Sequence, residues 1–301
     1  MKKLILLMLA LMLMITAAGC MAAEDTPSQA DEDTSLLEIM EKSKLVIGYE
    51  ETSYPFFYKD GADTFSGIEA EIIKEVCKRL ILDYEFKQVD ASESVGQLMS
   101  GKIDLLWGNI KRNEYDDVGY SDAFFKCETP VLLLRNDSKI DEVSELKDEK
   151  VGYLNLSRSG IQVNRLEGIA AAFAAYTSYK NMDDAVQDLL DRKLEAVVMD
   201  SVTAIYYTGN HPKDTFKSIT EGLSAETDEF SIGFNPLRAR LNQKIKEVTD
   251  LLLKDKTLEY FSNEQFGRNI IVLPPLTENP LFTEGTLSPY ISSDVSSAAQ
   301  K

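Results

Sequence analysis

Residues 183–200, DDAVQDLLDRKLEAVVMD, contain the most informative pattern for the fold class. An amphipathic helical stretch is followed by a basic turn and then by four apolar residues, 196–199, which are typical of a short buried strand. Residues 92–107, SESVGQLMSGKIDLLW, show the same order with a glycine-lysine turn. The plain interpretation is two βαβ units. A weak duplication of this kind is also what a protein with two similar lobes would contain.

Short strands alternate with helices along most of the chain. Strands are predicted from short apolar runs at residues 44–49, 84–89, 103–107, 130–134, 150–154, 196–199 and 230–234. Helices are predicted at residues 65–82, 95–99, 160–174, 182–191, 201–208, 236–254 and 258–266. Strands separated by helices indicate an α/β fold with open, mostly parallel sheets and helices on both faces.

The composition excludes several classes of protein. The 301 residues suffice for one large domain or two ordinary ones, and a hydrophobic fraction of 44% is typical of a folded core. A formal net charge of -18 argues against a nucleic-acid partner, because such binding requires a basic face. His211 is the only histidine, which excludes metal sites with two histidine ligands. The cysteines are far apart, so zinc ribbons and redox pairs are not expected.

The first 20 residues, MKKLILLMLALMLMITAAGC, have the pattern of a secretory signal. Two lysines precede an apolar run that is short for a membrane span of about 20 residues. The small residues before Cys20 resemble the lipobox of bacterial lipoproteins, in which the cysteine is acylated and begins the mature chain. An ordinary secretory signal with an incidental cysteine is the alternative. We therefore expect a signal peptide over residues 1–19 and a lipidated Cys20 that anchors the protein outside the cytoplasm.

Two polar segments flank the predicted folded part. Residues 20–36 are small, polar and acidic, so they cannot bury apolar surface and are expected to form a flexible tether. Residues 274–301 are rich in proline, serine and threonine and lack periodicity, which indicates a loosely ordered tail. The folded body is therefore expected between these two segments.

The order of many short motifs between Leu37 and Gly267 is similar to that of a known family. The segments are LVIGY, YPFFY, FSGIEAEIIKEV, LMSGKIDLLWGNI, YSDAFF, VGYLNLS, AVVMDSVTAIYY, FSIGF and LNQKIKEVTDLLLKDKTLEYF. In this order they resemble the bacterial extracellular solute-binding proteins of the polar amino-acid type, family 3, which serve ABC importers. No single motif is decisive, and the specificity lies in their order and spacing.

This resemblance implies a type II clamp, like that of periplasmic binding proteins, with two α/β lobes. Lobe 1 would comprise residues 43–127 and 231–270, and lobe 2 residues 132–226, with chain crossings near residues 127–131 and 225–230. Such hinges close around a ligand by changing a few backbone angles. The implied function is capture of an amino acid or similar small polar solute by a monomeric receptor, which delivers it to an ABC permease. No cofactor, metal or catalysis is implied.

In lobe 1 the resemblance implies a ligand contact for Glu50, which ends the first predicted strand and would accept from a ligand ammonium. A solvated loop acid is the alternative. Tyr54 and Phe56 lie where the family covers the ligand with an aromatic ring, although lobe packing would also explain them. In the family, backbone groups at the end of the third predicted strand meet the ligand, and the residues at this place are Trp107, Gly108 and Asn109. Trp107 would equally suit the core.

The largest departure from the family pattern follows that strand. The family has an arginine that clamps the ligand carboxylate by two hydrogen bonds, and Asp116 stands at the corresponding position here. Lys111 or Arg112 would supply the positive charge from a shifted position. If neither does, the ligand is not a standard α-amino acid.

In lobe 2 the resemblance implies two groups of ligand contacts. Ser157, Arg158 and Ser159 follow a predicted strand at the start of a helix, where free N–H groups and hydroxyls favour an anion. Ordinary helix capping would explain the serines as well. Asp200 ends a strand and matches the family aspartate that binds the α-ammonium, or it caps the helix that follows.

Three further questions stay open at this stage. Cys77 and Cys127 would be able to form a disulfide outside the cell, but two buried thiols are the simpler interpretation. The altered segment 111–116 also suits a sensor or interaction module that has lost amino-acid binding. An enzyme similar to cyclohexadienyl dehydratase would need a general acid such as Glu50, Glu69 or Asp200, and no catalytic set is evident around them.

Overall fold

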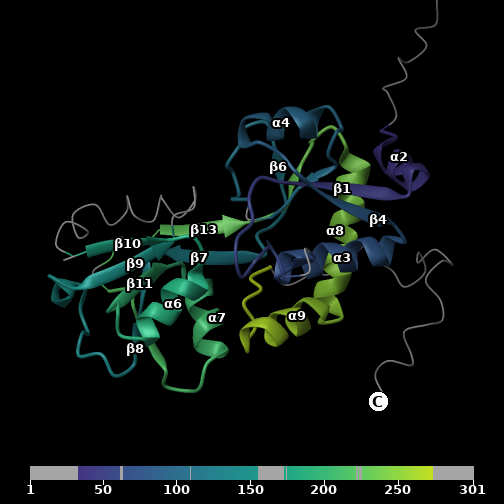
Figure 1. Ribbon diagram of the computed structural model, residues 1–301. Coiled ribbons are helices and arrows are strands. Elements are labelled where there is room, and N and C mark those ends of the chain that lie inside the picture. The colour runs from purple at the N-terminus through teal and green to yellow at the C-terminus, as the bar shows by residue number, and fades with distance from the viewer. Residues whose placement is uncertain are drawn as a thin grey trace, which may run out of the picture. The chain divides into compact units, whose positions relative to one another are not determined.

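The computed structural model describes residues 33–61, 64–108, 110–154, 173, 175–221, 223 and 226–273. These residues form two five-stranded sheets with helices beside them (Figure 1). Several sequence-based expectations fall outside the described residues. They are the signal peptide, the lipidated Cys20, most of the tether, the C-terminal tail, Asn109, the segment with Ser157, Arg158 and Ser159, and nearly all of the helix expected at residues 160–174.

The first sheet has the strand order β4-β1-β5-β14-β6. Its strands are β1 (Lys44–Tyr49), β4 (Asp83–Gln88), β5 (Leu105–Leu106), β6 (Gly119–Tyr120) and β14 (Gly233–Phe234). Strand β1 pairs in parallel with β4 and β5, whereas β14 pairs antiparallel with β5 and β6. Parallel pairing brings the carboxyl ends of β1, β4 and β5 to one edge of the sheet.

The helices of this part are α2 (Ser35–Lys42), α3 (Ile68–Leu80), α4 (Ala91–Met99), α8 (Ala239–Lys254) and α9 (Thr257–Phe266). A small hairpin, β2 (Tyr58–Lys59) with β3 (Phe65–Ser66), precedes α3. The larger apolar side chains of α3 recur three and four residues apart and are buried in one core with β1 and α8. This burial explains why the helix forms where its period predicts.

The second sheet has the strand order β10-β9-β11-β8-β12. Its strands are β8 (Val131–Arg135), β9 (Lys150–Leu154), β10 (Ala175–Tyr179), β11 (Ala196–Met199) and β12 (Phe216–Ile219). The accompanying helices are a 3-10 turn (Val143–Leu146), α6 (Met182–Leu190) and α7 (Ser201–Gly209). Strand β11 is buried throughout, since its alternate residues join two apolar clusters on opposite faces.

Two strands form a separate antiparallel pair. They are β7 (Phe125–Thr129) and β13 (Glu226–Phe230), which lie side by side in Figure 1. The chain passes through β7 between β6 of the first sheet and β8 of the second. It returns through β13 between β12 and β14. We call β7 and β13 the hinge strands.

The α/β fold class is confirmed, and three details differ from the sequence-based expectations. Each five-stranded sheet has two parallel and two antiparallel pairings, so neither is mostly parallel. Helix α2 begins at Ser35, so the expected tether over residues 20–36 is wrong at its end. Ser35 is buried there, and its hydroxyl accepts from the Leu241 backbone N–H at 3.2 Å.

The strand expected at residues 230–234 is divided into β13 and β14. The two residues between them bond elsewhere: the Ser231 N–H donates to the Ile110 carbonyl at 3.1 Å, and the Ile232 N–H donates to the Ser121 hydroxyl at 3.0 Å.

Cys77 and Cys127 are both free and buried, so they do not form a disulfide. Burial raises the pKa of the Cys77 thiol to about 12.

Candidate functional site

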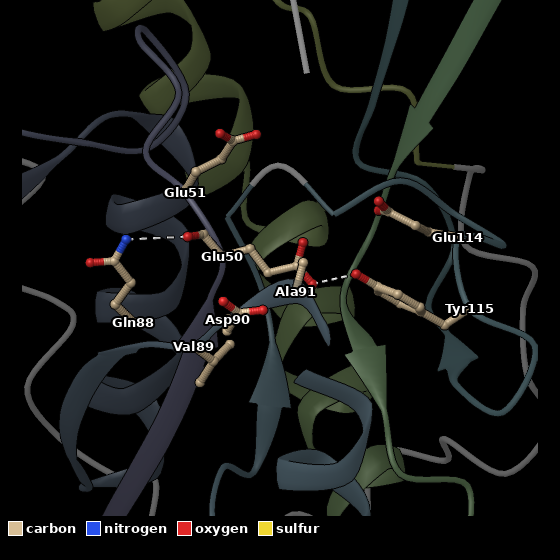
Figure 2. A pocket seen from close by; sticks show the side chains of 8 residues that line it. All are labelled: Glu50, Glu51, Gln88, Val89, Asp90, Ala91, Glu114 and Tyr115. Carbon is tan, nitrogen blue, oxygen red and sulfur yellow. Dashed lines mark hydrogen bonds between the residues drawn. The ribbon is translucent and has the colours of Figure 1, made fainter. Parts of the chain in front are cut away.

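A pocket of about 640 Å³ lies at the carboxyl edge of the first sheet (Figure 2). Its lining comes from the ends of β1 and β4, the start of α4 and the loop before β6. The lining residues are Glu50, Glu51, Gln88, Val89, Asp90, Ala91, Glu114 and Tyr115. This edge is where open α/β sheets bind ligands, because their strand-to-helix loops meet there.

Hydrogen bonds hold Glu50 at the centre of this lining. The Gln88 side-chain amide donates to the Glu50 carbonyl at 3.3 Å, which joins the ends of β1 and β4. The Tyr115 hydroxyl donates to Glu50 Oε1 at 2.5 Å, as the dashed line in Figure 2 shows. Burial, together with this bond to a carboxylate, raises the pKa of Tyr115 to about 12. Tyr115 therefore stays protonated at neutral pH and acts as a hydrogen-bond donor.

The pocket lining is acidic. Four of its residues, Glu50, Glu51, Asp90 and Glu114, carry carboxylates, and among the described residues that line it none is lysine, arginine or histidine. Asp90 caps α4 by accepting from the Ser92 N–H and hydroxyl, and these bonds lower the pKa of its carboxyl. A concave surface lined by charges of one sign concentrates ligands of the opposite sign. This arrangement therefore favours a cation.

Phe56 and Tyr54 do not line this pocket. Phe56 is only 3% exposed, and its ring packs against Phe125, Phe230 and Phe266. The structure thus places Phe56 in the core, which corrects the expectation that its ring covers a ligand.

Tyr54 instead joins a group of tyrosines that includes residues of α7. Its hydroxyl donates to the Tyr206 hydroxyl at 2.6 Å, and its ring contacts Tyr58, Tyr206 and Tyr207. Burial is the main cause of a raised pKa for Tyr54, and the bond to Tyr206 adds to it. In this conformation Tyr54 connects the loop after β1 to α7 and does not cover the pocket.

Trp107 and Gly108 also have structural roles. Trp107 is fully buried, and its indole N–H donates to the Glu69 carbonyl at 2.9 Å, so its side chain belongs to the core. Gly108 has φ +94°, and a Cβ there would lie 3.1 Å from the Phe57 ring and 3.2 Å from Tyr49 Cβ. A side chain at this position would therefore be strained and crowded.

Lys111 and Arg112 lie outside the pocket and pair with the hinge strand β13. Lys111 Nζ lies 2.9 Å from Asp228 Oδ2, and Arg112 Nη1 lies 3.2 Å from Glu229 Oε2. Glu229 also pairs with Lys126 of β7 at 2.6 Å. The two basic residues considered for a ligand carboxylate are thus engaged by acids of the protein itself.

Asp200 is half-buried and caps α7. Its Oδ1 accepts from the backbone N–H groups of Val202 and Thr203 at 3.0 and 2.8 Å, and its Oδ2 accepts from the Thr203 hydroxyl at 2.6 Å. Burial raises the pKa of the Asp200 carboxyl, while these hydrogen bonds oppose the rise. Asp200 also contributes to the raised pKa of Cys127, after the larger effect of burial, so it lies beside the hinge strand β7. It is not among the residues that line the pocket.

Of the residues that line the pocket, only Glu50 was predicted from the sequence as a ligand contact. Gln88 is the last residue of β4, and Val89 and Asp90 follow it. Because β4 pairs in parallel with β1, both strands end at the same edge of the sheet, beside Glu50. Glu114 and Tyr115 lie in segment 111–116, which departs from the family pattern and therefore gave no position to match them to. The usable signal was position at strand ends, since all parallel strands end at the same edge.

The model of one protein family matches residues 45–268 of the chain, under the description "Bacterial extracellular solute-binding proteins, family 3". The chain belongs to this family. The match spans both sheets and the hinge strands, which confirms the resemblance inferred from the motif order. Members of this family are extracytoplasmic solute-binding proteins of ABC transporters.

Two relatives of this family member are named as amino-acid-binding proteins. The L-cystine-binding protein TcyA of Bacillus subtilis is 23% identical over 276 residues, covering 90% of this chain and 99% of TcyA. The histidine-binding periplasmic protein of Salmonella typhimurium is 24% identical over 237 residues, covering 74% of this chain and 90% of that protein. By their names, both relatives are binding proteins, one for L-cystine and one for histidine.

Solved structures show the same fold. A polar amino acid ABC uptake transporter substrate-binding protein from Streptococcus thermophilus has a TM-score of 0.62 and 20% identity, covering 78% of this chain and 90% of its own. An ancestral cationic amino acid solute-binding protein has a TM-score of 0.65 and 20% identity, and the alignment covers 77% of this chain and 99% of that protein. At this identity the likeness establishes the fold, which is that of type II periplasmic binding proteins.

Two features are absent from the described residues of this family member. None of their helices is both long and apolar enough to cross a membrane. Within the same residues, no group of three or more His, Cys, Asp or Glu side chains is arranged to hold a metal ion.

Proposed function

We propose that this protein captures an amino acid or related amine with a cationic group, in a cleft between two lobes, for an ABC importer. The lobes would comprise residues 43–127 with 231–270, and residues 132–226. The acidic pocket at the end of β1 carries this proposal, because its four carboxylates favour a positively charged ligand. Family membership supports solute binding, and the relatives named for cystine and histidine support an amino acid.

Two carboxylates have the principal roles in this proposal. Glu50 would accept from the ligand ammonium, and the Tyr115 hydroxyl holds it in place through Oε1. Asp200 would approach the same ligand from the second lobe when the clamp closes. The hydrogen bonds by which Asp200 caps α7 leave lone pairs on both of its carboxylate oxygens. A ligand cation would favour the ionised carboxylate and so offset the effect of burial, which raises the pKa of Asp200.

The ligand carboxylate would not use the usual arginine. Asp116 stands at that position, and Lys111 and Arg112 pair with β13. A ligand whose positive charge exceeds its negative charge therefore suits the site better than an acidic or neutral amino acid. Ser157, Arg158 and Ser159 are proposed as a second anchor at the start of a helix, on sequence grounds alone.

Delivery of the solute requires a membrane partner. We propose a monomeric receptor that is attached to the outer face of the cell membrane through acylated Cys20 and that docks on an ABC permease. The signal-like residues 1–19 and the small residues before Cys20 support the anchor. An acyl chain on the tether would keep the folded body near the permease.

A thermal-shift panel tests this function directly. Lysine, arginine, ornithine and simple diamines are expected to raise the melting temperature, whereas glutamate and aspartate are not. A ligand that binds only the folded state, at about a hundred times its dissociation constant, adds about 2.7 kcal/mol to stability. Stabilisation by glutamate alone would contradict the proposal. No stabilisation by any compound would favour a sensor or interaction module.

A further inference from the structure

The hinge strands are attached to their surroundings at opposite ends. On the first-sheet side, the Arg112 backbone N–H donates to the Glu229 carbonyl at 2.6 Å. On the second-sheet side, the Glu128 N–H donates to the hydroxyl of Ser201, the first residue of α7, at 2.9 Å. Of the two hinge strands, β13 is thus bonded to the first-sheet side through Glu229, and β7 is bonded to the second-sheet side through Glu128.

Ion pairs strengthen the attachment on the first-sheet side. Lys111 pairs with Asp228, and Glu229 pairs with both Arg112 and Lys126. The Lys111 and Asp228 side chains are 22% and 18% exposed, so solvent screens this pair less than a fully exposed one. Lys126 and Arg112 lower the pKa of the Glu229 carboxyl, which therefore stays ionised at neutral pH.

The register of the hinge strands locates the part that these contacts do not hold. Asp228 lies opposite Cys127, and Thr227 lies opposite Glu128. Residues from Asp228 onward are fixed to the loop of Lys111 and Arg112, and Glu128 is fixed to α7. The backbone between these attachments is the short stretch around Cys127 and Thr227.

We propose that Lys111 and Arg112 are positioning residues of the hinge, which fix β13 to the first lobe and confine bending to the stretch around Cys127 and Thr227. This inference rests on the proposed function, since bending matters because the lobes close around a ligand. A hinge with one defined pivot loses less conformational freedom on closure than a hinge that bends at many residues. Lys111 and Arg112 therefore increase ligand affinity without contacting the ligand.

The test uses the double variant Lys111→Ala/Arg112→Ala of the full chain. Without ligand, the amides of β13 are expected to exchange with deuterium about threefold to tenfold faster, because each lost ion pair contributes modestly. With L-lysine and L-arginine as probes, affinity is expected to fall by about the same factor. Lys246→Ala is the matched control, because it removes an ion pair of α8 with Asp250, away from the hinge.

A charge exchange separates the hinge role from direct ligand contact. In Lys111→Asp/Asp228→Lys the pair is restored with reversed polarity, and we expect β13 exchange and probe affinity to return toward the values of the unmodified protein. A ligand clamp at Lys111 would instead lose affinity in both variants and leave ligand-free exchange unchanged. That result, or exchange that never differs from the Lys246→Ala control, would overturn the inference. If neither probe binds, the proposed function fails, and the ligand-free exchange still decides the hinge role.

Discussion

Replacement of Asp200 by asparagine is expected to weaken binding of a cationic ligand by about tenfold to a hundredfold, while the ligand-free protein stays folded. Asparagine caps helices about as well as aspartate, so the bonds from Val202 and Thr203 to Oδ1 can persist. The negative charge is lost, and a hydrogen bond to a charged group contributes about 1.5–3 kcal/mol. Isothermal titration with the strongest ligand of the panel, alongside a melting curve, measures both quantities.

Two further variants make this result interpretable. Asp141→Asn changes the net charge equally at a residue that is 82% exposed, near the second sheet, and is expected to leave affinity unchanged. Asp200→Ala removes the cap as well as the charge, so it should cost about 1 kcal/mol of stability in addition to the loss of affinity. Undiminished affinity in Asp200→Asn would remove Asp200 from the site.

Replacement of Asp104 by alanine is expected to lower the free energy of unfolding by about 3–5 kcal/mol, as measured by urea denaturation. Asp104 is 2% exposed and joins three elements. Its Oδ2 accepts from Lys42 Nζ of α2 and from the Val46 N–H of β1, both at 2.8 Å. Its Oδ1 accepts from Arg238 Nη1 at 2.6 Å, just before α8. Alanine would leave the largely buried guanidinium of Arg238 without this acceptor.

A pair on the surface of the same sheet provides the control for Asp104. Lys44 and Glu85 lie 3.2 Å apart with side chains 43% and 49% exposed, so Glu85→Ala should cost at most about 1 kcal/mol. Asp104→Asn keeps an acceptor for the Val46 N–H, so its loss in the free energy of unfolding should lie between the losses for Asp104→Ala and Glu85→Ala. Equal small losses in Asp104→Ala and Glu85→Ala would show that the buried network does not stabilise the fold.

Much of the fold was predictable because its strands and helices have clear periods. The run KLVIGY at residues 44–49 is apolar and buried, and it forms β1 over the predicted residues. Helix α3 and strand β11 follow their patterns in the same way. The hinge strand β13 was not predicted, because ETDEF has neither an apolar run nor a regular alternation. Its backbone bonds to β7, a partner about a hundred residues away, determine its structure.

Less of the candidate site was predictable, because the roles of single side chains depend on their partners. Glu50 follows β1 and lines the pocket as its position indicates. Phe56 and Trp107 have the residue types of ligand contacts, but aromatic rings serve the core equally well, and both are buried there. Lys111 and Arg112 have the charge of a carboxylate clamp, but Asp228 and Glu229 of β13 are close enough to pair with them.

The most direct test of the central claim is a crystal structure of the protein with its strongest ligand from the panel. The ligand ammonium or guanidinium is expected to lie in the pocket within hydrogen-bond distance of the Glu50 carboxylate, with Asp200 approaching it from the other lobe. A ligand carboxylate at Glu50, or a ligand held at a place that involves none of the acidic pocket residues, would contradict it.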